Sequence, residues 1–358
     1  MKRLRLTPLK LSIALILTVL GMAATAWALT NTYAAHEPEQ ATMAGAVSAV
    51  SDTSASNGSA IKFGQAAIGC PGATGTPGGE DPWGGCWPGP HNTGVPQGAP
   101  GDTRTPVTLT PYTGPCSINT DNVRIDSKEV NCERLRIPAD NVNIVNSRIN
   151  GRIDTPSPLD PQYSFNFTLT DSDVAVGELL GEKAVKLGNM VVTRANITGT
   201  TNSITCTANC TVIDSWLHDQ ATDPDGIMHV SALRQGNGGL YRHNSLICEA
   251  ARGQGAGGAC SGAITGYGDQ VVVQNNLIER NLILAGTSSI CVYGGSGNGR
   301  IYADQANNIR FLNNVFSRGT SGRCGLYALV AAWRPELPGN LWQGNTYLED
   351  GLPALDTD

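Results

Sequence analysis

The feature that most constrains the fold is a short motif that recurs along the chain from residue 121 onward. Each copy has alternating apolar residues, then a polar pair, then another apolar residue. The clear copies are VNIVNSRI (142–149), FTLTDSDV (167–174), MVVTRANI (190–197), CTVIDSWL (210–217), GLYRHNSLI (239–247), VVVQNNLI (271–278) and IRFLNNVF (309–316). VRIDSKEV (123–130) and NLWQGNTY (340–347) are weaker first and last copies. Repeats of roughly 20–50 residues are typical of solenoids, in which each repeat buries its apolar face against its neighbours.

The composition of the repeats selects the kind of solenoid. They are rich in Val, Ile and Thr, and only GELLGEKAVKL (177–187) has a helical pattern. The sequence therefore predicts an all-β fold, a right-handed, single-stranded parallel β-helix of about eight or nine coils. The polar pair marks a tight bend, where asparagine adopts a left-handed backbone and bonds its neighbours. Stacked coils lie about 4.8 Å apart, so a ladder of structural asparagines is expected from Asn146, Asn244, Asn275, Asn276, Asn313 and Asn314. His243 occupies the same bend column and is also interpreted as structural.

The N-terminal part has a different character. Four basic residues precede the apolar run LSIALILTVLGMAATA, and Ala26-Trp27-Ala28 follows, so residues 1–28 are predicted to be a cleaved secretory signal peptide, with an uncleaved anchor as the alternative. Residues 29–60 are predicted to be a disordered linker. Residues 61–115 form a Gly/Pro-rich N-terminal cap segment, residues 116–350 the β-helix domain and residues 351–358 a C-terminal tail.

Ten cysteines behind a signal peptide predict five disulfides in an oxidising, extracellular compartment. We expect sequential pairing: Cys70–Cys86, Cys116–Cys132, Cys206–Cys210, Cys248–Cys260 and Cys291–Cys324.

Removing residues 1–28 takes away four basic and no acidic residues, so the net charge falls from -6 to -10. This charge excludes nucleic acid as an expected partner. We predict a secreted monomer that does not associate with the membrane after signal cleavage. In one interpretation it is associated with the cell wall.

At this point the sequence resembles secreted actinobacterial right-handed β-helix proteins of the pectate-lyase-like superfamily. The segments that carry the resemblance are CWPGPHNTGVPQG, LTPYTGPCSINTDNVRIDSKEVNC, NVNIVNSRINGRI, CTVIDSWLHDQ, DPDGI and RHNSLIC, within residues 86–350. The superfamily includes polysaccharide lyases, glycoside hydrolases, uronate epimerases and non-enzymatic adhesins. The resemblance therefore implies a carbohydrate-active or surface protein whose extracellular partner is a polysaccharide, and fold alone does not choose between these.

A second set of strand-like pieces lies between the bend motifs: DGIMHVSAL (225–233), CSGAITGYGD (260–269), SSICVYGG (288–295) and RCGLYALV (323–330). If these pieces stack, their side chains form one column, the face that superfamily enzymes use. The predicted catalytic residues are His218, Asp225, His229, Tyr293 and Arg323. The predicted substrate-binding residues are Lys183, Lys186, Tyr267 and Tyr327. Asp219, Asp223 and Asp269 are predicted to hold calcium, the one candidate cofactor, because calcium binds several oxygens; ordinary turn capping is the alternative for the loop acids.

Two reactions fit these residues. In β-elimination on a uronate polymer, His218 or His229 is the base, Arg323 or calcium neutralises the carboxylate, and Tyr293 is the acid. In hydrolysis, Asp225 acts with Asp223 or Asp269 as a carboxylate pair. The chain lacks the Asp-Asp, Gly-His-Gly and Arg-x-Lys motifs of polygalacturonase-type hydrolases, which argues against that kind of hydrolysis. The set of His, Tyr and Arg residues slightly favours elimination. A non-catalytic polysaccharide-binding or cell-surface structural protein is the alternative from another class.

Overall fold

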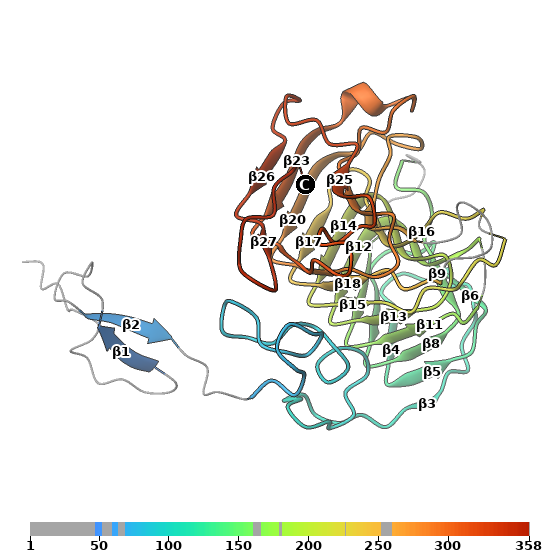
Figure 1. The fold of residues 1–358 in the computed structure, drawn as a ribbon. Coiled ribbons are helices and arrows are strands. Elements are labelled where there is room, and N and C mark those ends of the chain that lie inside the picture. Colours follow the sequence, from blue (N-terminus) through green and yellow to red (C-terminus); the bar gives the residue numbers. More distant parts are fainter. Residues whose placement is uncertain are drawn as a thin grey trace, which may run out of the picture. The chain divides into compact units, whose positions relative to one another are not determined.

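The computed structural model describes residues 47–51, 59–63, 69–159, 166–178, 181–225, 227–251 and 260–357. The chain divides into two units, residues 1–66 and 67–358. In the first unit, β1 (Val47–Ser51) pairs antiparallel with β2 (Ser59–Phe63) (Figure 1). The predicted signal peptide, residues 1–28, lies outside the described residues.

Part of the predicted linker has regular structure. β1 and the first two residues of β2 fall within residues 29–60, where no regular structure was expected. The strands VSAVS and SAIKF contain Val and Ile, which favour extended backbone. At five residues each, they are too short to show a clear periodicity in the sequence. The linker residues before Val47 lie outside the described residues.

The second unit is built from β-strands that form three faces. Face 1 consists of β6 (Arg134–Arg136), β9 (Arg152–Asp154), the first halves of β12 (Lys183–Thr193) and β14 (Asn202–Ile213), β16 (Val230–Arg234), β19 (Cys260–Thr265), β22 (Ile290–Tyr293) and β25 (Ala328–Ala331). Face 2 consists of β4 (Arg124–Asp126), β7 (Val142–Val145), β10 (Phe167–Thr170), the second halves of β12 and β14, β17 (Leu240–Arg242), β20 (Gln274–Glu279), β23 (Asn307–Leu312) and β26 (Leu341–Gln343).

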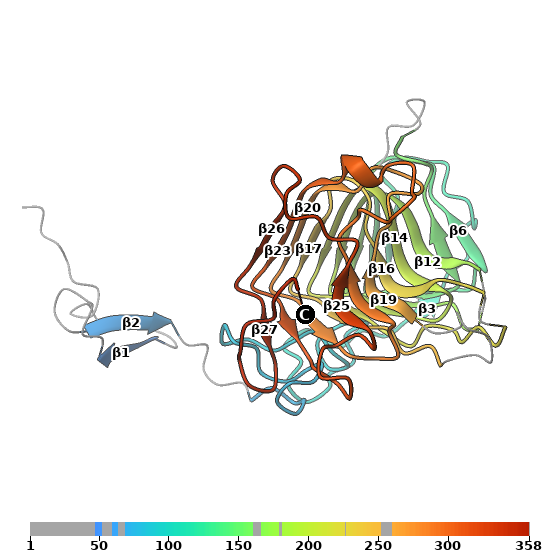
Figure 2. The same ribbon diagram turned by 45° about the horizontal axis from the view of Figure 1, so that its top comes forward.

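Face 3 is a ten-stranded sheet. It consists of β3 (Thr110–Pro111), β5 (Lys128–Val130), β8 (Arg148–Asn150), β11 (Asp173–Ala175), β13 (Asn196–Thr198), β15 (Trp216–Leu217), β18 (Ser245–Ile247), β21 (Leu282–Leu284), β24 (Val315–Phe316) and β27 (Thr346–Tyr347). From β9 onward the chain visits faces 1, 2 and 3 in turn, and neighbouring strands on each face are parallel (Figure 2). The predicted all-β, parallel, solenoid-like fold is confirmed, and it is compatible with a parallel β-helix.

The core is made of apolar columns that run across the coils. On face 2 the strand register aligns Ile125, Ile144, Leu169, Val192, Val212, Tyr241, Ile278, Phe311 and Trp342. On face 3 it aligns Val130, Ile149, Val174, Ile197, Leu217, Leu246, Ile283, Phe316 and Tyr347. Nearly all of these side chains are buried. Each coil therefore covers the apolar face of the next, as the repeat pattern predicts.

The polar pair of the motif forms the bend between face 2 and face 3. Its first residue has a left-handed backbone, with φ of 50° at Asn146, 49° at Asp171, 51° at His243 and 54° at Asn313. The residue that follows is buried and polar in most coils, and its side chain bonds along the stack. The predicted bend and its structural role are confirmed for these positions, including His243.

The predicted asparagine ladder is present in the C-terminal coils. The side chains of Asn244, Asn281, Asn314 and Asn345 are buried and follow one another along the stack. The Asn314 Oδ1 atom accepts from the backbone N–H of Asn281 at 3.1 Å and from its Nδ2 at 2.9 Å. In the earlier coils Ser147, Ser172 and Ser215 replace asparagine and bond along the stack through their hydroxyls.

The register predicted for one repeat was wrong. In VVVQNNLIERNLI the bend between faces 2 and 3 is Arg280-Asn281, with φ of 52° at Arg280, rather than Asn275-Asn276. β20 continues through Ile278 before it bends, because Ile278 occupies the buried column position on face 2. Asn275 and Asn276 are structural, as predicted, but at the bend between faces 1 and 2. Asn275 belongs to an exposed ladder with Asn237 and Asn308.

The Gly/Pro-rich segment lies along the side of the solenoid. We call residues 69–109 the strap. Trp87 is fully buried and packs with Leu282 and Val315 of face 3. Further along the strap, the Gly94 N–H donates to the Arg194 carbonyl at 2.9 Å. The segment then enters face 3 as β3, so it passes from the C-terminal coils to the N-terminal coil (Figure 1).

Two polar clusters attach the strap to the bends. The Arg104 guanidinium bonds to Asp102 of the strap and, at 2.8 Å, to Asp171 of the solenoid. His243 stacks on Trp87, with ring centroids 5.5 Å apart, and lies between Asp81 and Asp214. The strap is thus held by charged groups as well as by apolar packing.

All five predicted disulfides are confirmed, with the predicted sequential connectivity. Such bonds fit an oxidising, extracellular environment.

At the C-terminal end, the tail packs against the last coil, since the Trp342 Nε1–H donates to the Ala354 carbonyl at 2.7 Å. Among the described residues, no helix is long and apolar enough to cross a membrane.

Candidate functional site

Face 1 carries a continuous column of polar side chains. The strand register aligns them in successive coils as Arg136, Asp154, Lys186, Thr205, Arg234, Thr265 and Tyr293. Arg136 is exposed, and Lys186 and Arg234 are half-buried. The sequence pieces predicted to stack on one face do so here for β16, β19, β22 and β25.

The N-terminal half of this column is an ion-pair network. The buried carboxylate of Asp154 pairs with Arg134 and, at 3.5 Å, with the Lys186 Nζ atom. Lys186 also lies 3.6 Å from Glu182. The column and its partners hold six basic residues against four acidic ones, a local excess of two positive charges on a chain of net charge -6. These residues are Arg134, Arg136, Arg152, Lys183, Lys186, Arg234, Glu133, Asp154, Glu182 and Asp269.

The predicted substrate-binding lysines both lie in this network. Lys186 is one of its paired members, as described. The Lys183 ammonium donates to the carbonyls of Gly181 at 3.1 Å and Glu182 at 3.3 Å. Burial lowers the pKa of Lys183, and the neighbouring Lys186 and Arg234 add to this effect, whereas Glu182 opposes it.

The C-terminal half of the column has an aromatic and polar cluster. The Tyr267 ring lies 4.8 Å from that of Tyr293 and 5.9 Å from that of His229. The His229 Nδ1 atom is 3.0 Å from the Ser261 hydroxyl. The Arg234 guanidinium lies 5.2 Å from the centre of the Tyr267 ring and pairs with Asp269. Three predicted site residues, His229, Tyr267 and Tyr293, are therefore brought together.

Burial sets the protonation of this cluster. It raises the pKa of Tyr267 well above the usual range, although a hydrogen bond to Ser261 partly offsets the effect. Burial also raises the pKa of Tyr293. Burial acts to raise the pKa of Asp269 too, but the hydrogen bond from Arg234 outweighs it and the pKa is lowered. At neutral pH the cluster thus has two phenol donors and a carboxylate paired with arginine.

The space beside this cluster is small. The cavity lined by Arg234, Tyr267 and Asp269 has a volume of about 10 Å³. A volume of about 10–15 Å³ suits a single water molecule, so a sugar ring would contact this cluster from outside.

His218 lies elsewhere, just after β15. Its ring stacks on Trp216 with centroids 3.4 Å apart, and its Nε2 atom is 2.8 Å from the Asn196 Oδ1 atom. Its Nδ1 atom is 3.0 Å from an Asp219 carboxylate oxygen. Burial lowers the pKa of His218 to about 4, outweighing the attraction of Asp219. Among the described residues, no hydrogen bond, ion pair or ring contact joins His218 to His229.

The acids predicted to hold calcium have separate partners. The Asp223 carboxylate accepts from the backbone N–H groups of Asp225, Ile227 and Met228 at 3.1, 2.6 and 2.7 Å. It therefore orders its own loop, which was the turn-capping alternative. Asp269 pairs with Arg234 and Asp219 with His218. The Asp225 side chain is exposed.

The two predicted residues of the last coils lie on the surface. Tyr327 is 66% exposed, and its N–H donates to the Ser289 carbonyl at 2.9 Å. The Arg323 guanidinium is 3.4 Å from the Tyr327 carbonyl. Within the described ranges, no hydrogen bond, ion pair or ring contact joins Arg323 to the His229 cluster, and the arginine that lies over the Tyr267 ring is Arg234.

Sequence reasoning missed Arg234, Ser261 and Glu249. Arg234 is the last residue of β16 and directly follows the piece DGIMHVSAL (225–233). Extending that piece by one residue would have included it. Glu249 has an exposed side chain in a loop, and no sequence signal connects it to His218. Its Oε2 atom accepts from the Asp219 N–H at 3.1 Å.

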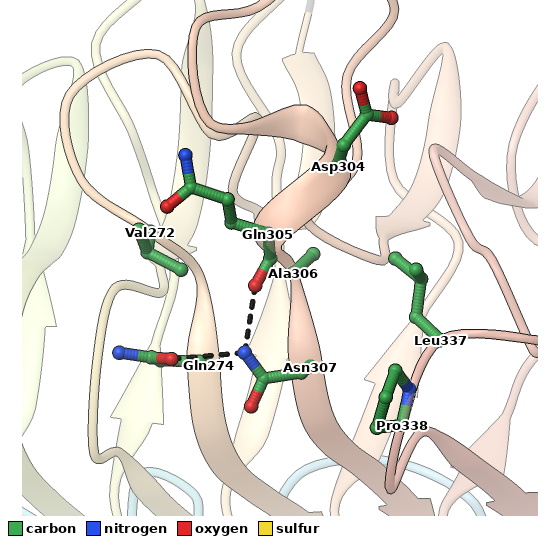
Figure 3. A pocket seen from close by; sticks show the side chains of 8 residues that line it. All are labelled: Val272, Gln274, Asp304, Gln305, Ala306, Asn307, Leu337 and Pro338. Carbon is green, nitrogen blue, oxygen red and sulfur yellow. Dashed lines mark hydrogen bonds between the residues drawn. The ribbon is translucent and has the colours of Figure 1, made fainter.

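The larger cavity lies at the bend between faces 1 and 2. It has a volume of about 400 Å³ and is lined by Val272, Gln274, Asp304, Gln305, Ala306, Asn307, Leu337 and Pro338 (Figure 3). The Asn307 Nδ2 atom donates to the Gln274 side chain at 3.0 Å and to the Gln305 carbonyl at 2.7 Å. Of these lining residues only Asp304 has an acidic or basic side chain, and it pairs with Arg334. The cavity contains none of the predicted site residues.

Comparisons with protein-family models, with curated proteins and with solved structures found no match.

Proposed function

We propose that the protein is a secreted, right-handed parallel β-helix of the pectate-lyase-like kind that binds an acidic extracellular polysaccharide along face 1. The observation that carries this proposal is the continuous polar column with its local excess of positive charge. Parallel coils repeat about every 4.8 Å. Basic side chains occur in every second coil of the first five, at Arg136, Lys186 and Arg234, so they lie roughly 10 Å apart along an extended polymer. Arginine binds carboxylates through two parallel hydrogen bonds.

Local charge matters here because the whole chain is acidic. The net charge, -6 for the full chain and -10 without residues 1–28, repels a polyanion at long range, whereas a local excess of positive charge attracts it. On binding, Lys186 would exchange its ion pairs with Asp154 and Glu182 for ion pairs with uronate groups of the polymer.

The first test is affinity electrophoresis through gels that contain polygalacturonate, alginate or neutral dextran. The protein is expected to be retarded by the two uronate polymers, and less so at high salt. Lys186→Gln should weaken binding about three- to fivefold, because a partly exposed charge contact is worth up to about 1 kcal/mol. Arg310→Gln is the control, since Arg310 is an exposed strand residue on face 2. Equal retardation in dextran, or equal loss in both variants, would contradict the proposal.

A second candidate function, β-elimination, is favoured by the His229, Tyr267, Tyr293 and Arg234 cluster. The His229 imidazole would take the proton beside the uronate carboxylate, and Arg234 would neutralise that carboxylate. Tyr267, which is protonated at neutral pH, would donate a proton to the leaving glycosidic oxygen. The C–O bond breaks as the carbon–carbon double bond forms, so protons and electrons balance. Hydrolysis is less favoured, since Asp269 is paired with Arg234 and Asp223 with backbone N–H groups.

Elimination is measured by the ultraviolet absorbance of unsaturated ends. If it occurs, Tyr267→Phe should lower the rate about a hundredfold or more, as expected for loss of a general acid. Tyr112→Phe is the control, because the Tyr112 hydroxyl bonds to the Pro115 carbonyl, away from the cluster. If the protein is retarded in the uronate gels but the ultraviolet absorbance does not rise, elimination is rejected and polysaccharide binding remains as the function.

A further inference from the structure

The cavity of about 400 Å³ at the bend between faces 1 and 2 lies outside the proposed polysaccharide-binding column. Its volume falls within the range of about 300–1,000 Å³ that is usual for small-molecule sites. Figure 3 shows Val272 and Gln274 on one side, Leu337 and Pro338 on the other, and Asn307 between them. The cavity is therefore walled by segments of three successive coils rather than by a single loop.

The walls of this cavity are held in place by the fold. Gln274 of β20 and Asn307 of β23 lie directly opposite each other in the parallel ladder. On the other side, the Asn308 N–H donates to the Pro338 carbonyl at 2.8 Å, and Leu337 packs against the apolar core. The cavity is thus formed before any ligand enters it, which lowers the entropic cost of binding.

The polar lining consists of three side-chain amides. The Asn307 Nδ2 atom lies 2.7 Å from the Gln305 carbonyl oxygen, which only accepts, so the orientation of this amide is determined. The same Nδ2 atom donates to the Gln274 Oε1 atom at 3.0 Å. Asn307 Oδ1 is left as an acceptor and Gln274 Nε2 as a donor, and neither atom has a partner among the described residues. The Gln305 side chain likewise has no partner in that part of the chain.

The lining also excludes several kinds of ligand. Its one charged side chain, Asp304, is paired with Arg334, so a charged ligand would find no free group of opposite sign. None of the lining residues is aromatic, and a flat aromatic ring would therefore have nothing to stack on. Strands β20 and β23 are paired on both sides, so a peptide could not be added to them as a further strand.

We propose that this cavity binds one ring of a neutral sugar within an extracellular oligosaccharide or polysaccharide. A hydroxyl group both donates and accepts hydrogen bonds, so sugar hydroxyls match the free acceptor of Asn307 and the free donor of Gln274. The C–H groups of the ring would lie against Val272, Leu337 and Pro338, which removes apolar surface from water. The ligand is uncharged and the site is separate from face 1, so this activity goes beyond the binding of uronate polymers.

The test is a titration of the disulfide-intact protein with cellotetraose, mannotetraose, xylotetraose and maltotetraose, followed by NMR of the side-chain amides. Saturable binding is expected for at least one of these oligosaccharides. The amide signals of Gln274, Gln305 and Asn307 should shift, whereas that of Gln343, an exposed residue on face 2, should not. The affinity should be the same at low and high salt, because the ligand carries no charge.

Two variants locate the binding. Gln305→Ala should weaken it about two- to tenfold, as expected for the loss of one hydrogen bond between neutral groups. Gln305 is exposed, so this substitution is expected to leave the fold intact. Gln343→Ala is the matched control, since it removes an exposed glutamine outside the cavity. Lys186→Gln should leave the binding of neutral oligosaccharides unchanged, because Lys186 belongs to the column on face 1.

Three results would overturn the proposal. The first is that none of the four oligosaccharides binds. The second is a Gln305→Ala variant that binds as tightly as the unsubstituted protein. The third is binding that Lys186→Gln weakens more than Gln305→Ala does, because this would place the neutral sugar on face 1.

Discussion

Replacing Asn314 by alanine is expected to lower the free energy of unfolding by about 3–6 kcal/mol. The Asn314 side chain is fully buried and makes four hydrogen bonds. Its oxygen accepts twice from Asn281, and its Nδ2 atom donates to the Ile278 carbonyl and the Asn345 side chain, each at 2.9 Å. Alanine would leave several buried groups unpaired, and each costs about 1–3 kcal/mol.

The exposed asparagine ladder provides the control for this prediction. The Asn308 side chain donates to the Asn275 side chain at 3.0 Å in a bond that water reaches, since Asn275 is exposed and Asn308 is only half-buried. Asn308 has φ of 48°, so glycine is the substitution that keeps its backbone conformation. Asn308→Gly should cost less than about 1 kcal/mol, because water replaces the lost bond. The measurement is chemical denaturation of both variants beside the unsubstituted protein. Equal losses of unfolding free energy in the two variants would mean that burial does not determine how much the asparagine ladder stabilises the protein.

Raising the pH from 6.5 to about 9 is expected to loosen the strap through His243. Burial lowers the pKa of His243, but its hydrogen bonds to Asp214 and Asp81 outweigh this and raise the pKa to about 9. The folded protein thus holds a proton that the unfolded chain releases near pH 6.5. The resulting stability is fully present below pH 6.5 and is lost as the pH rises through 9. A rise of this size corresponds to at most about 3 kcal/mol.

The measurement is the thermal midpoint of unfolding between pH 5.5 and 9.5. In His243→Gln the fall in midpoint over the window from pH 6.5 to 9 should be largely absent, and the variant should be less stable at pH 6. His91→Gln is the control, because His91 lies in the same strap but outside the pair of Asp81 and Asp214. If His243→Gln keeps the full pH dependence, another group holds the proton and the interpretation is wrong.

Much of the fold could be predicted because every coil of a solenoid is stabilised by the same kinds of packing and hydrogen bonding. Apolar residues such as Ile144 and Leu169 recur at the position where each coil covers the next, and the pattern survives substitution at any one coil. The disulfides also followed from order along the chain, since cysteines in neighbouring coils are close in sequence. The Asn275-Asn276 pair shows the limit. Two polar pairs occur within the seven residues 275–281, and only the burial of Ile278 selects Arg280-Asn281 as the bend between faces 2 and 3.

The candidate site was less predictable, because its residues meet across coils of unequal length. His229, Tyr267 and Tyr293 were found from the sequence, since they lie in or next to β16, β19 and β22, which are in register. Arg323 was expected beside them, but it is exposed before β25, and Arg234 takes the place beside Tyr267. The sequence by itself determined the parallel strands, the polar bends and the disulfides, all of which depend on local periodicity. Only the tertiary structure decided which side chains of distant loops converge, such as His218 and Glu249, because loop paths depend on packing and hydrogen bonds between coils.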